Sequence, residues 1–423
     1  MATYFVKNGG NDEASGLSHA DAWATIAKVN SFSFAPSDVV QFCQLHTFEG
    51  CLDSSHFAGV TFRSYDPASG DPSAAGTRAL LQNTTPVNVV HVTTNTDDIV
   101  LDNLELATNE PVTGAGSHAV VMNSSSAPVC RDWTIRNCYI HQAGGSGVQT
   151  IGAGSTGWTI EGTAAGLMEI ADVGDCGWLI DAVSSGHEVD GGADLGVTIH
   201  DTGGFDAAYG RHGIYAKGAV IVHGVEFYAN VNGQSVSIRR EGSEVYGCYF
   251  HDTAEGAVYF FDATGTGGTG TVYIYQNILD NVPNAFFADH DVYFDMVIAS
   301  NTLRGLTTGC AANFAALLHA SVEFKNNIVS GGDHAFWGHN PDLDSSEETI
   351  EDYNCWYNQA EYAPFQWNGS FYEPSAYQAA SGQSEHAVYS DPILEITYPF
   401  ALDPYSPAID TGTPDVAGLT YTQ

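Results

Sequence analysis

The chain has 423 residues, of which only 12 are Lys or Arg while 50 are Asp or Glu, so its formal net charge at pH 7 is −38. Long-range repulsion of polyanions by such a surface argues against nucleic acid and anionic membranes as partners. The 46 Gly, 21 Tyr and 21 Phe, with only 15% charged residues, are typical of a turn-rich and aromatic-rich β protein.

The chain shows no obvious linker, so we expect one elongated domain rather than several average ones. No apolar run approaches the roughly 20 residues that cross a bilayer. The first ten residues lack the features of a signal peptide, so we expect either a signal removed earlier or export by another route, such as a phage particle. The eight cysteines permit disulfides, for example Cys43 with Cys51 and Cys130 with Cys138, but we expect most to be buried free thiols.

The opening segment predicts a short helix. Residues Ser18 to Asn30 have helix-compatible spacing, with Ser18 as a possible N-cap and Trp23, Ile26 and Ala27 on one side. Such a helix would close the open end of a repetitive core, and we assign residues 1–40 to this N-terminal cap.

Short β segments of one kind recur through the middle of the chain, which we assign to residues 41–350. From Val197 onward their first residues are 28, 23, 29, 24 and 26 positions apart, which is a solenoid period. An asparagine or a small residue opens many of them, as expected where side chains stack at a turn between coils. The segments begin at Asn103, Asn137, Val197, Val225, Cys248, Asn277, Asn301 and Asn327.

A second strand in each repeat can be aligned from residues 213–217, 235–239, 257–261 and 285–289. Because side chains alternate along a strand, one face carries only apolar residues: Ile214, Ala216, Val236, Ile238, Val258, Phe260, Phe286 and Ala288. The other face carries Tyr215, Lys217, Ser237, Arg239, Tyr259, Phe261, Phe287 and Asp289. Equivalent positions of stacked coils lie about 4.8 Å apart, so we expect Lys217 and Arg239 to be neighbours on an outer wall that forms a binding groove.

Four of the twelve basic residues fall in one short window: Arg211, Lys217, Arg239 and Arg240. Such an island in so acidic a chain indicates a site for a negative group of a ligand. The alternative is a structural cluster of ion pairs with nearby acids. Beyond it, residues 351–423 are rich in Tyr, Trp and Pro and break the repeat, so we expect a loop-rich segment packed on the last coils.

These features resemble the right-handed parallel β-helix proteins, a pectin-lyase-like superfamily of carbohydrate-active enzymes, bacterial surface proteins and phage tailspikes. The segment from Asn11 to Asn30 looks like the opening of many of them, and Ser390-Asp391-Pro392 with residues 406–412 looks like the exit. The resemblance spans essentially the whole chain. It implies an all-β, single-domain right-handed parallel β-helix with a short N-terminal capping helix and an irregular C-terminal segment, but one fold hosts many chemistries.

Within this superfamily, the pair Lys217 and Arg239 is similar to the catalytic Lys and Arg of alginate and chondroitin lyases. The resemblance implies that Lys217 removes the proton α to a uronate carboxylate and that Arg239 assists on the leaving side. Cations must stabilise the charge that develops while a neutral amine takes the proton. Repulsion from Arg211, Arg239 and Arg240 would favour the neutral amine of Lys217.

The lyases of this fold hold calcium with acids just before the Lys, whereas the corresponding stretch here reads Tyr209-Gly210-Arg211-His212-Gly213. We therefore expect a site without metal or cofactor, in which Arg211 or Arg240 neutralises the substrate carboxylate. His212 and Tyr215 are alternative bases, although His212 is equally explained as a turn residue. Tyr215 fits a stacking platform under a sugar ring better than catalysis.

Two other functions stay open. Asp262, Asp289 and Asp291 fall near the same wall, and a glycoside hydrolase needs two carboxyl groups at a set separation. Alternatively, the aromatic wall of Tyr259, Phe261 and Phe287 would bind glycan without cleaving it, as in a tailspike-like receptor binder or surface protein. In every case we expect a polysaccharide partner and an extracellular or virion location. We expect a monomer, or a homotrimer if the protein comes from a phage.

Overall fold

The computed structural model describes residues 1–83, 88–108, 118–122, 128–152, 154–164, 167–180, 185–204, 211–262, 270–288, 290–306, 309–314, 320–338, 349–395 and 401–419. The chain divides into two compact units, unit 1 (Met1–Glu226) and unit 2 (Phe227–Gln423). Strand β21 (Val225–Tyr228) crosses the division. Within each unit the chain winds through three sheets, which we call sheets A, B and C.

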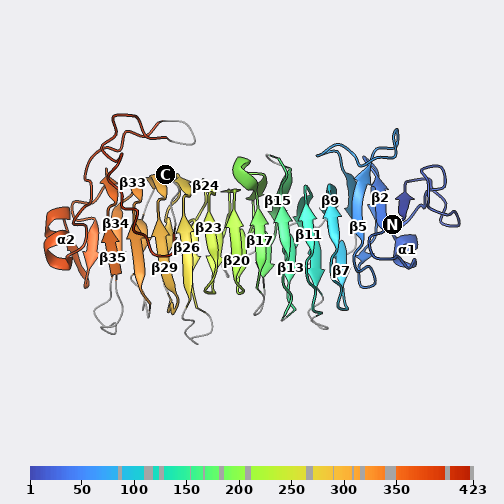
Figure 1. The fold of residues 1–423 in the computed structure, drawn as a ribbon, viewed down its shortest axis with the longest axis horizontal. Coiled ribbons are helices and arrows are strands. Elements are labelled where there is room, and N and C mark those ends of the chain that lie inside the picture. Colours follow the sequence, from blue (N-terminus) through green and yellow to red (C-terminus); the bar gives the residue numbers. More distant parts are fainter. Residues whose placement is uncertain are drawn as a thin grey trace. The chain divides into compact units, whose positions relative to one another are not determined.

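Unit 1 passes through sheets A, B and C in turn, and each strand pairs in parallel with its counterpart one coil later (Figure 1). Sheet A contains β1 (Thr3–Val6), β2 (Val39–Cys43), β5 (Thr61–Tyr65), β8 (Val100–Asp102), β11 (Thr134–Arg136), β14 (Thr159–Glu161), β17 (His187–Asp190) and β20 (Val220–His223). Sheet B contains β3 (Thr47–Glu49), β6 (Ala79–Gln82), β9 (Leu104–Ala107), β12 (Tyr139–Ala143), β15 (Met168–Val173) and β18 (Val197–His200). Sheet C contains β4 (Leu52–Asp53), β7 (Val90–Val92), β10 (Val120–Met122), β13 (Val148–Thr150), β16 (Trp178–Ile180) and β19 (Ile214–Ala216). A 3-10 turn, Gly192–Asp194, precedes β18.

Unit 2 repeats the same path. Its part of sheet A contains β23 (Glu244–Tyr246), β26 (Thr271–Tyr275), β29 (Asp295–Ala299), β32 (Val322–Lys325) and β35 (Thr349–Asp352). Its part of sheet B contains β24 (Tyr249–His251), β27 (Ile278–Asp280), β30 (Thr302–Leu306), β33 (Ile328–Gly331) and β36 (Cys355–Tyr357). Its part of sheet C contains β22 (Val236–Ile238), β25 (Val258–Phe260), β28 (Phe286–Phe287), β31 (Cys310–Asn313), β34 (His334–Gly338), β37 (Phe365–Trp367) and β38 (Ser370–Tyr372).

The predicted parallel β-helix is confirmed. The segments recognised from their repeat form strands of sheet B, and the second aligned set forms strands of sheet C. Sheet A supplies a third strand in each coil, which was not predicted from the sequence. Inward side chains of successive coils stack in the core, as in unit 1, where the rings of Trp133 and Trp158 are parallel with centroids 4.7 Å apart.

The helix near the N-terminus is shorter than predicted, and Ser18 is not its cap. Helix α1 spans Ile26–Asn30, and the Thr25 side chain caps it by accepting a hydrogen bond from the Lys28 backbone N–H at 3.1 Å. Trp23 cannot be helical because its backbone pairs with that of Phe5 in β1, with Trp23 N–H donating to the Phe5 carbonyl at 2.8 Å. Ser18 instead donates its hydroxyl to Asp21 in a local turn.

The coils continue beyond residue 350, where we had placed the start of the loop-rich segment. Strands β35, β36 and β37 each pair in parallel with the preceding coil. Strand β38 then turns back antiparallel to β37, and helix α2 (Pro374–Ser381) follows. The Phe365 and Tyr377 rings stack with centroids 4.5 Å apart, so α2 closes this end of the unit 2 core.

A buried asparagine ladder joins the coils of unit 2, which confirms the predicted stacking of asparagines at a turn. Asn277, Asn301 and Asn327 each donate a side-chain N–H to the side-chain oxygen of the next asparagine, ending at Asn354, over 3.0 to 3.1 Å. All four are at most 1% exposed. Each asparagine therefore makes the hydrogen bonds that water would otherwise make to its buried neighbours.

Candidate functional site

Three predicted site residues, Tyr215, Tyr259 and Phe287, lie on strands of sheet C, and Lys217, Arg239 and Phe261 each directly follow such a strand. In unit 2 the apolar positions are buried register partners across three strands, as predicted: Val236, Val258 and Phe286. Because side chains alternate along a strand, the opposite face carries its own row of register partners: Ser237, Tyr259 and Phe287. The predicted register and inward positions are thus confirmed in unit 2.

In unit 1, three predicted catalytic residues form one cluster at β19. Lys217 directly follows this strand, and its Nζ lies 5.4 Å from the centroid of the Tyr215 ring, within cation–π range. The Tyr215 ring stacks on the His212 ring with centroids 5.2 Å apart. Lys217 and Tyr215 are half-buried, whereas His212 is only 3% exposed. The cluster therefore presents an amine and a phenol to solvent above a buried imidazole.

Arg211 has a carboxylate partner that the sequence reading missed. Its Nη1 lies 2.7 Å from Oδ1 of Asp175, and both side chains are 23% exposed. Arg211 thus belongs to a local ion-pair group, as the structural alternative anticipated.

Arg240 also lies beside an acid. Its Nε is 3.4 Å from Oε2 of the neighbouring residue Glu241, and the two side chains are 32% and 27% exposed. A partly exposed pair of this kind contributes little stability, so Glu241 holds the Arg240 side chain only weakly.

In unit 2, a cation and four aromatic rings, including the imidazole of His290, form a second cluster. The Arg239 Cζ atom lies 4.0 Å from the centroid of the Phe261 ring. The edge of His290 meets Phe261 at 4.8 Å, and the Tyr259 hydroxyl is 3.1 Å from Nδ1 of His290. Tyr259 in turn stacks on Phe287 at 5.4 Å. The wall thus combines a guanidinium with ring faces, a combination suited to an anionic sugar.

The predicted carboxyl pair lies next to this cluster. The Asp262 backbone N–H donates to the Asp291 carbonyl at 3.1 Å, which places the two residues on adjacent coils. Asp262 is 9% exposed and Asp291 is half-buried. Asp289 lies outside the described residues.

Lys217 belongs to unit 1 and Arg239 belongs to unit 2. Each directly follows a strand of sheet C and lies beside an aromatic ring. Their direct adjacency stays a prediction from the sequence repeat.

Two residues that contact the predicted site residues, Asp175 and His290, were not predicted from the sequence. Asp175 lies 36 positions before Arg211, and a chain with 50 acids offers no signal that selects one of them. His290 stands between Asp289 and Asp291 in the sequence, and nothing in that stretch indicates a contact with aromatic rings. Its contacts with Tyr259 and Phe261 arise from the stacking of coils.

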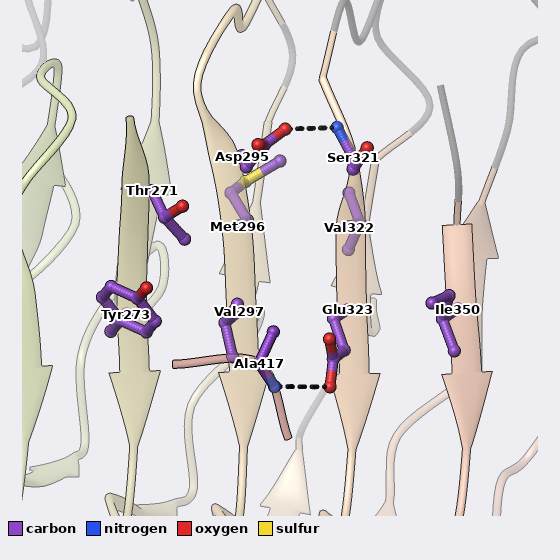
Figure 2. Close-up of a pocket in the computed structure, with 10 residues that line it drawn as sticks. All are labelled: Thr271, Tyr273, Asp295, Met296, Val297, Ser321, Val322, Glu323, Ile350 and Ala417. Atoms are coloured by element: carbon purple, nitrogen blue, oxygen red, sulfur yellow. Dashed lines mark hydrogen bonds between the residues drawn. The ribbon is translucent and has the colours of Figure 1, made fainter. Parts of the chain in front are cut away.

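A cavity of about 230 Å³ lies on sheet A of unit 2, away from these clusters (Figure 2). Its floor includes Val297, and Figure 2 shows Asp295 and Glu323 accepting backbone hydrogen bonds from Ser321 at 2.9 Å and from Ala417 at 3.2 Å. Both carboxylates therefore already have protein partners. None of the described residues that the sequence predicted for the site lines this cavity.

The described part of the chain contains no group of three or more His, Cys, Asp or Glu side chains arranged to hold a metal ion. Within those same ranges, no helix has the length and apolar character needed to cross a membrane.

No family model matches the sequence, and no curated protein matches it. Among solved structures, XylC in complex with xylose is similar with a TM-score of 0.58 and 10% identity, over 93% of this chain and 87% of that one. Pectate lyase Pel9A has a TM-score of 0.50 and 11% identity, over 100% of this chain and 94% of that one. An alginate lyase from a Paenibacillus species has a TM-score of 0.45 and 16% identity, over 76% of this chain and 98% of that one. At these identities the likeness concerns the fold alone, and the chain has the parallel β-helix fold of the pectate-lyase type.

Proposed function

We propose that this protein is a polysaccharide lyase that cleaves a uronate-containing glycan by β-elimination. The observation that carries the proposal is the Arg239 guanidinium, 4.0 Å from the Phe261 ring, near the half-buried Phe287 that stacks on the buried Tyr259. A guanidinium stabilises negative charge on oxygen, and ring faces suit a pyranose. The fold shared with pectate lyase Pel9A gives general support.

Lys217 is the proposed base. Its neutral amine takes the proton from the carbon next to the uronate carboxyl group, and the electron pair of that C–H bond forms a carbon–carbon double bond. The bond between the next ring carbon and the glycosidic oxygen breaks, and that oxygen takes a proton from water while Arg239 stabilises it. Tyr215 lies beside the amine and is, with His212, an alternative proton acceptor.

Arginine side chains neutralise the carboxylate in this proposal, without a metal or another cofactor. Arg240 fits this role better than Arg211, because its pair with Glu241 is longer and more exposed than the 2.7 Å pair between Arg211 and Asp175. Because polymeric glycans of this kind occur outside cells, the proposal implies a secreted or virion-bound protein.

The test is incubation with polygalacturonate, alginate, chondroitin and the neutral glycan xylan, followed by the ultraviolet absorbance of the unsaturated product. Wild type is expected to act on one polyuronate and not on xylan. Lys217→Ala and Lys217→Arg should lower the rate by at least about 100-fold, since neither keeps a neutral amine. Lys7→Ala is the control because Lys7 follows β1 in sheet A. Absence of unsaturated product from every polyuronate, or a Lys217→Ala variant as fast as wild type, would contradict the proposal.

A glycoside hydrolase is the second candidate, favoured by the backbone hydrogen bond that joins Asp262 and Asp291 on adjacent coils. Such an enzyme would use two of the carboxyl groups of Asp262, Asp289 and Asp291, and this contact favours the pair Asp262 and Asp291. It would release reducing ends without ultraviolet absorbance, and Asp262→Asn or Asp291→Asn would abolish that release. Glycan binding without any product would instead identify a noncatalytic, tailspike-like binder.

A further inference from the structure

The outward row that contains Tyr259 and Phe287 continues through unit 2 to the last strand of sheet C. Register partners extend it strand by strand across β31, β34, β37 and β38. The full row is Ser237, Tyr259, Phe287, Asn313, Trp337, Gln366 and Phe371. With about 4.8 Å between neighbouring strands, it runs about 29 Å across the sheet.

The chemistry of this row suits a carbohydrate chain. Ser237 and Tyr259 are buried at the start of the row. From Phe287 onward, the rings of Phe287 and Trp337 alternate with the amide side chains of Asn313 and Gln366, so surfaces for stacking lie next to groups for hydrogen bonding. The row contains no Asp or Glu, although the net charge of the chain is −38. A polyanionic glycan therefore meets no carboxylate within the row.

The far end of the row forms an aromatic cluster that the predicted site does not include. The rings of His334 and Trp337 have centroids 4.7 Å apart, and Phe371 lies 5.7 Å from His334 and 5.9 Å from Trp337. Trp337 Nε1 and His334 Nδ1 are buried and have no hydrogen-bond partner among the residues that the structure describes. A polar group buried without a partner is costly, so a ligand hydroxyl or a water molecule that supplies one is favoured here.

Closure of the core does not explain this cluster. The end of the unit 2 core is closed by Phe365 and Tyr377, which are fully buried and stacked. Gln366 and Phe371 are register partners on the opposite face of the β37–β38 hairpin, and Phe371 is 51% exposed. Phe371 forms one continuous aromatic patch with His334 and Trp337, and a contiguous patch of this kind marks a binding surface.

We propose that His334, Trp337 and Phe371 form a distal subsite, which binds the same glycan chain several sugar units away from Arg239. The inference rests on the proposed function for the identity of the ligand. Its specific claim is that one linear, acidic glycan lies across the strands of sheet C along the row. Binding then depends on the length of the chain, because only a long oligosaccharide reaches Trp337.

The test compares tetrasaccharides with dodecasaccharides prepared from polygalacturonate, alginate and chondroitin, and the kinetic measurements use the polyuronate that wild type cleaves. Trp337→Ala and Phe371→Ala should each raise KM for the dodecasaccharide about tenfold, as expected for the loss of one stacking contact. They should leave KM for the tetrasaccharide and kcat for both substrates unchanged. Trp337→Phe keeps a ring and should retain most of the affinity. Tyr405→Ala is the matched control, since Tyr405 is an 88% exposed aromatic residue outside the row.

Calorimetric binding of the same oligosaccharides separates this inference from the proposed function. If wild type forms no unsaturated product but binds the dodecasaccharide more tightly than the tetrasaccharide, and Trp337→Ala removes the difference, the lyase proposal fails and the subsite stands. The subsite would be overturned if Trp337→Ala lost equal affinity for both oligosaccharide lengths, if it lost affinity for neither, or if wild type bound neither. Thermal unfolding of each variant shows whether a loss of affinity reflects misfolding. If Trp337→Ala is misfolded, the affinity of Trp337→Phe for the two oligosaccharide lengths decides the question.

Discussion

Asn301 occupies the middle of the buried ladder in unit 2, where its side chain serves two coils at once. Its Nδ2 donates to the Ile274 carbonyl at 3.1 Å and to Asn327 Oδ1 at 3.0 Å. Its Oδ1 accepts the backbone and side-chain N–H groups of Asn277, both at 3.0 Å. Removal of this one amide leaves several buried groups without partners.

Asn301→Ala is therefore expected to destabilise the protein by about 3 kcal/mol, since each buried group left unsatisfied costs about 1–3 kcal/mol. The measurement is urea unfolding, with Asn8→Ala as the control because Asn8 is exposed. Equal unfolding midpoints for Asn301→Ala and wild type would show that the ladder contributes nothing to stability.

The sequence was sufficient to predict the ladder because an asparagine opens successive repeats. It was insufficient for ion pairs such as Arg211 with Asp175, because these depend on which acid a coil brings near the cation. The contact of Arg239 with Phe261 was predictable, since both residues occupy the same position in adjacent repeats.

At the scale of elements, the strands of sheets B and C were predictable from repeated apolar positions. Those of sheet A were not, because several contain a single buried residue between two partly exposed ones, as in β11 and β14. Three residues with one apolar position carry no periodic signal. The β37–β38 hairpin and α2 were also missed, because they follow the last repeat.

A buried carboxyl group ties the C-terminal segment to the last coil of unit 2. Glu351 is 0% exposed, and burial raises its pKa from 4.5 to about 7. Asn354 Nδ2 donates to its Oε1 at 2.6 Å, Trp356 Nε1 donates to the same oxygen at 3.2 Å, and the Ser384 hydroxyl donates to Oε2. Ser384 and the asparagine ladder thus meet at one ionisable group.

Because the folded state holds the protonated form more tightly, the contribution of Glu351 to stability is complete below pH 4.5. It is lost as pH rises from about 4.5 to about 7. The loss is about 3 kcal/mol, and Glu351→Gln should remove this part of the pH dependence. Chemical unfolding at several pH values measures it, with exposed Glu361→Gln as the control. A Glu351→Gln variant that keeps the full pH dependence would contradict this role.

At the scale of the whole molecule, all eight cysteines are free thiols, and seven of them are buried. Burial raises the pKa of Cys138 to about 12, so its reactive thiolate is scarce at neutral pH. The expectation of buried free thiols is thus confirmed, and the two possible disulfides, Cys43 with Cys51 and Cys130 with Cys138, are not formed.

Reducing agent should therefore leave the melting temperature unchanged. In the native protein, a thiol reagent should react rapidly with at most Cys51, which is the one partly exposed cysteine. Unfolding should expose all eight thiols. A lower melting temperature under reduction would contradict this assignment.

The central claim is that sheet C binds an acidic glycan with Arg239 at the leaving oxygen and Arg240 at the carboxylate, and it is tested most directly by a crystal structure of the Lys217→Ala variant with a bound oligouronate. The account predicts the scissile glycosidic oxygen at the Arg239 guanidinium and beside position 217, a sugar carboxylate on Arg240, and a sugar ring against Phe287. A glycan bound on sheet A or sheet B, or in the cavity of Figure 2, would contradict it.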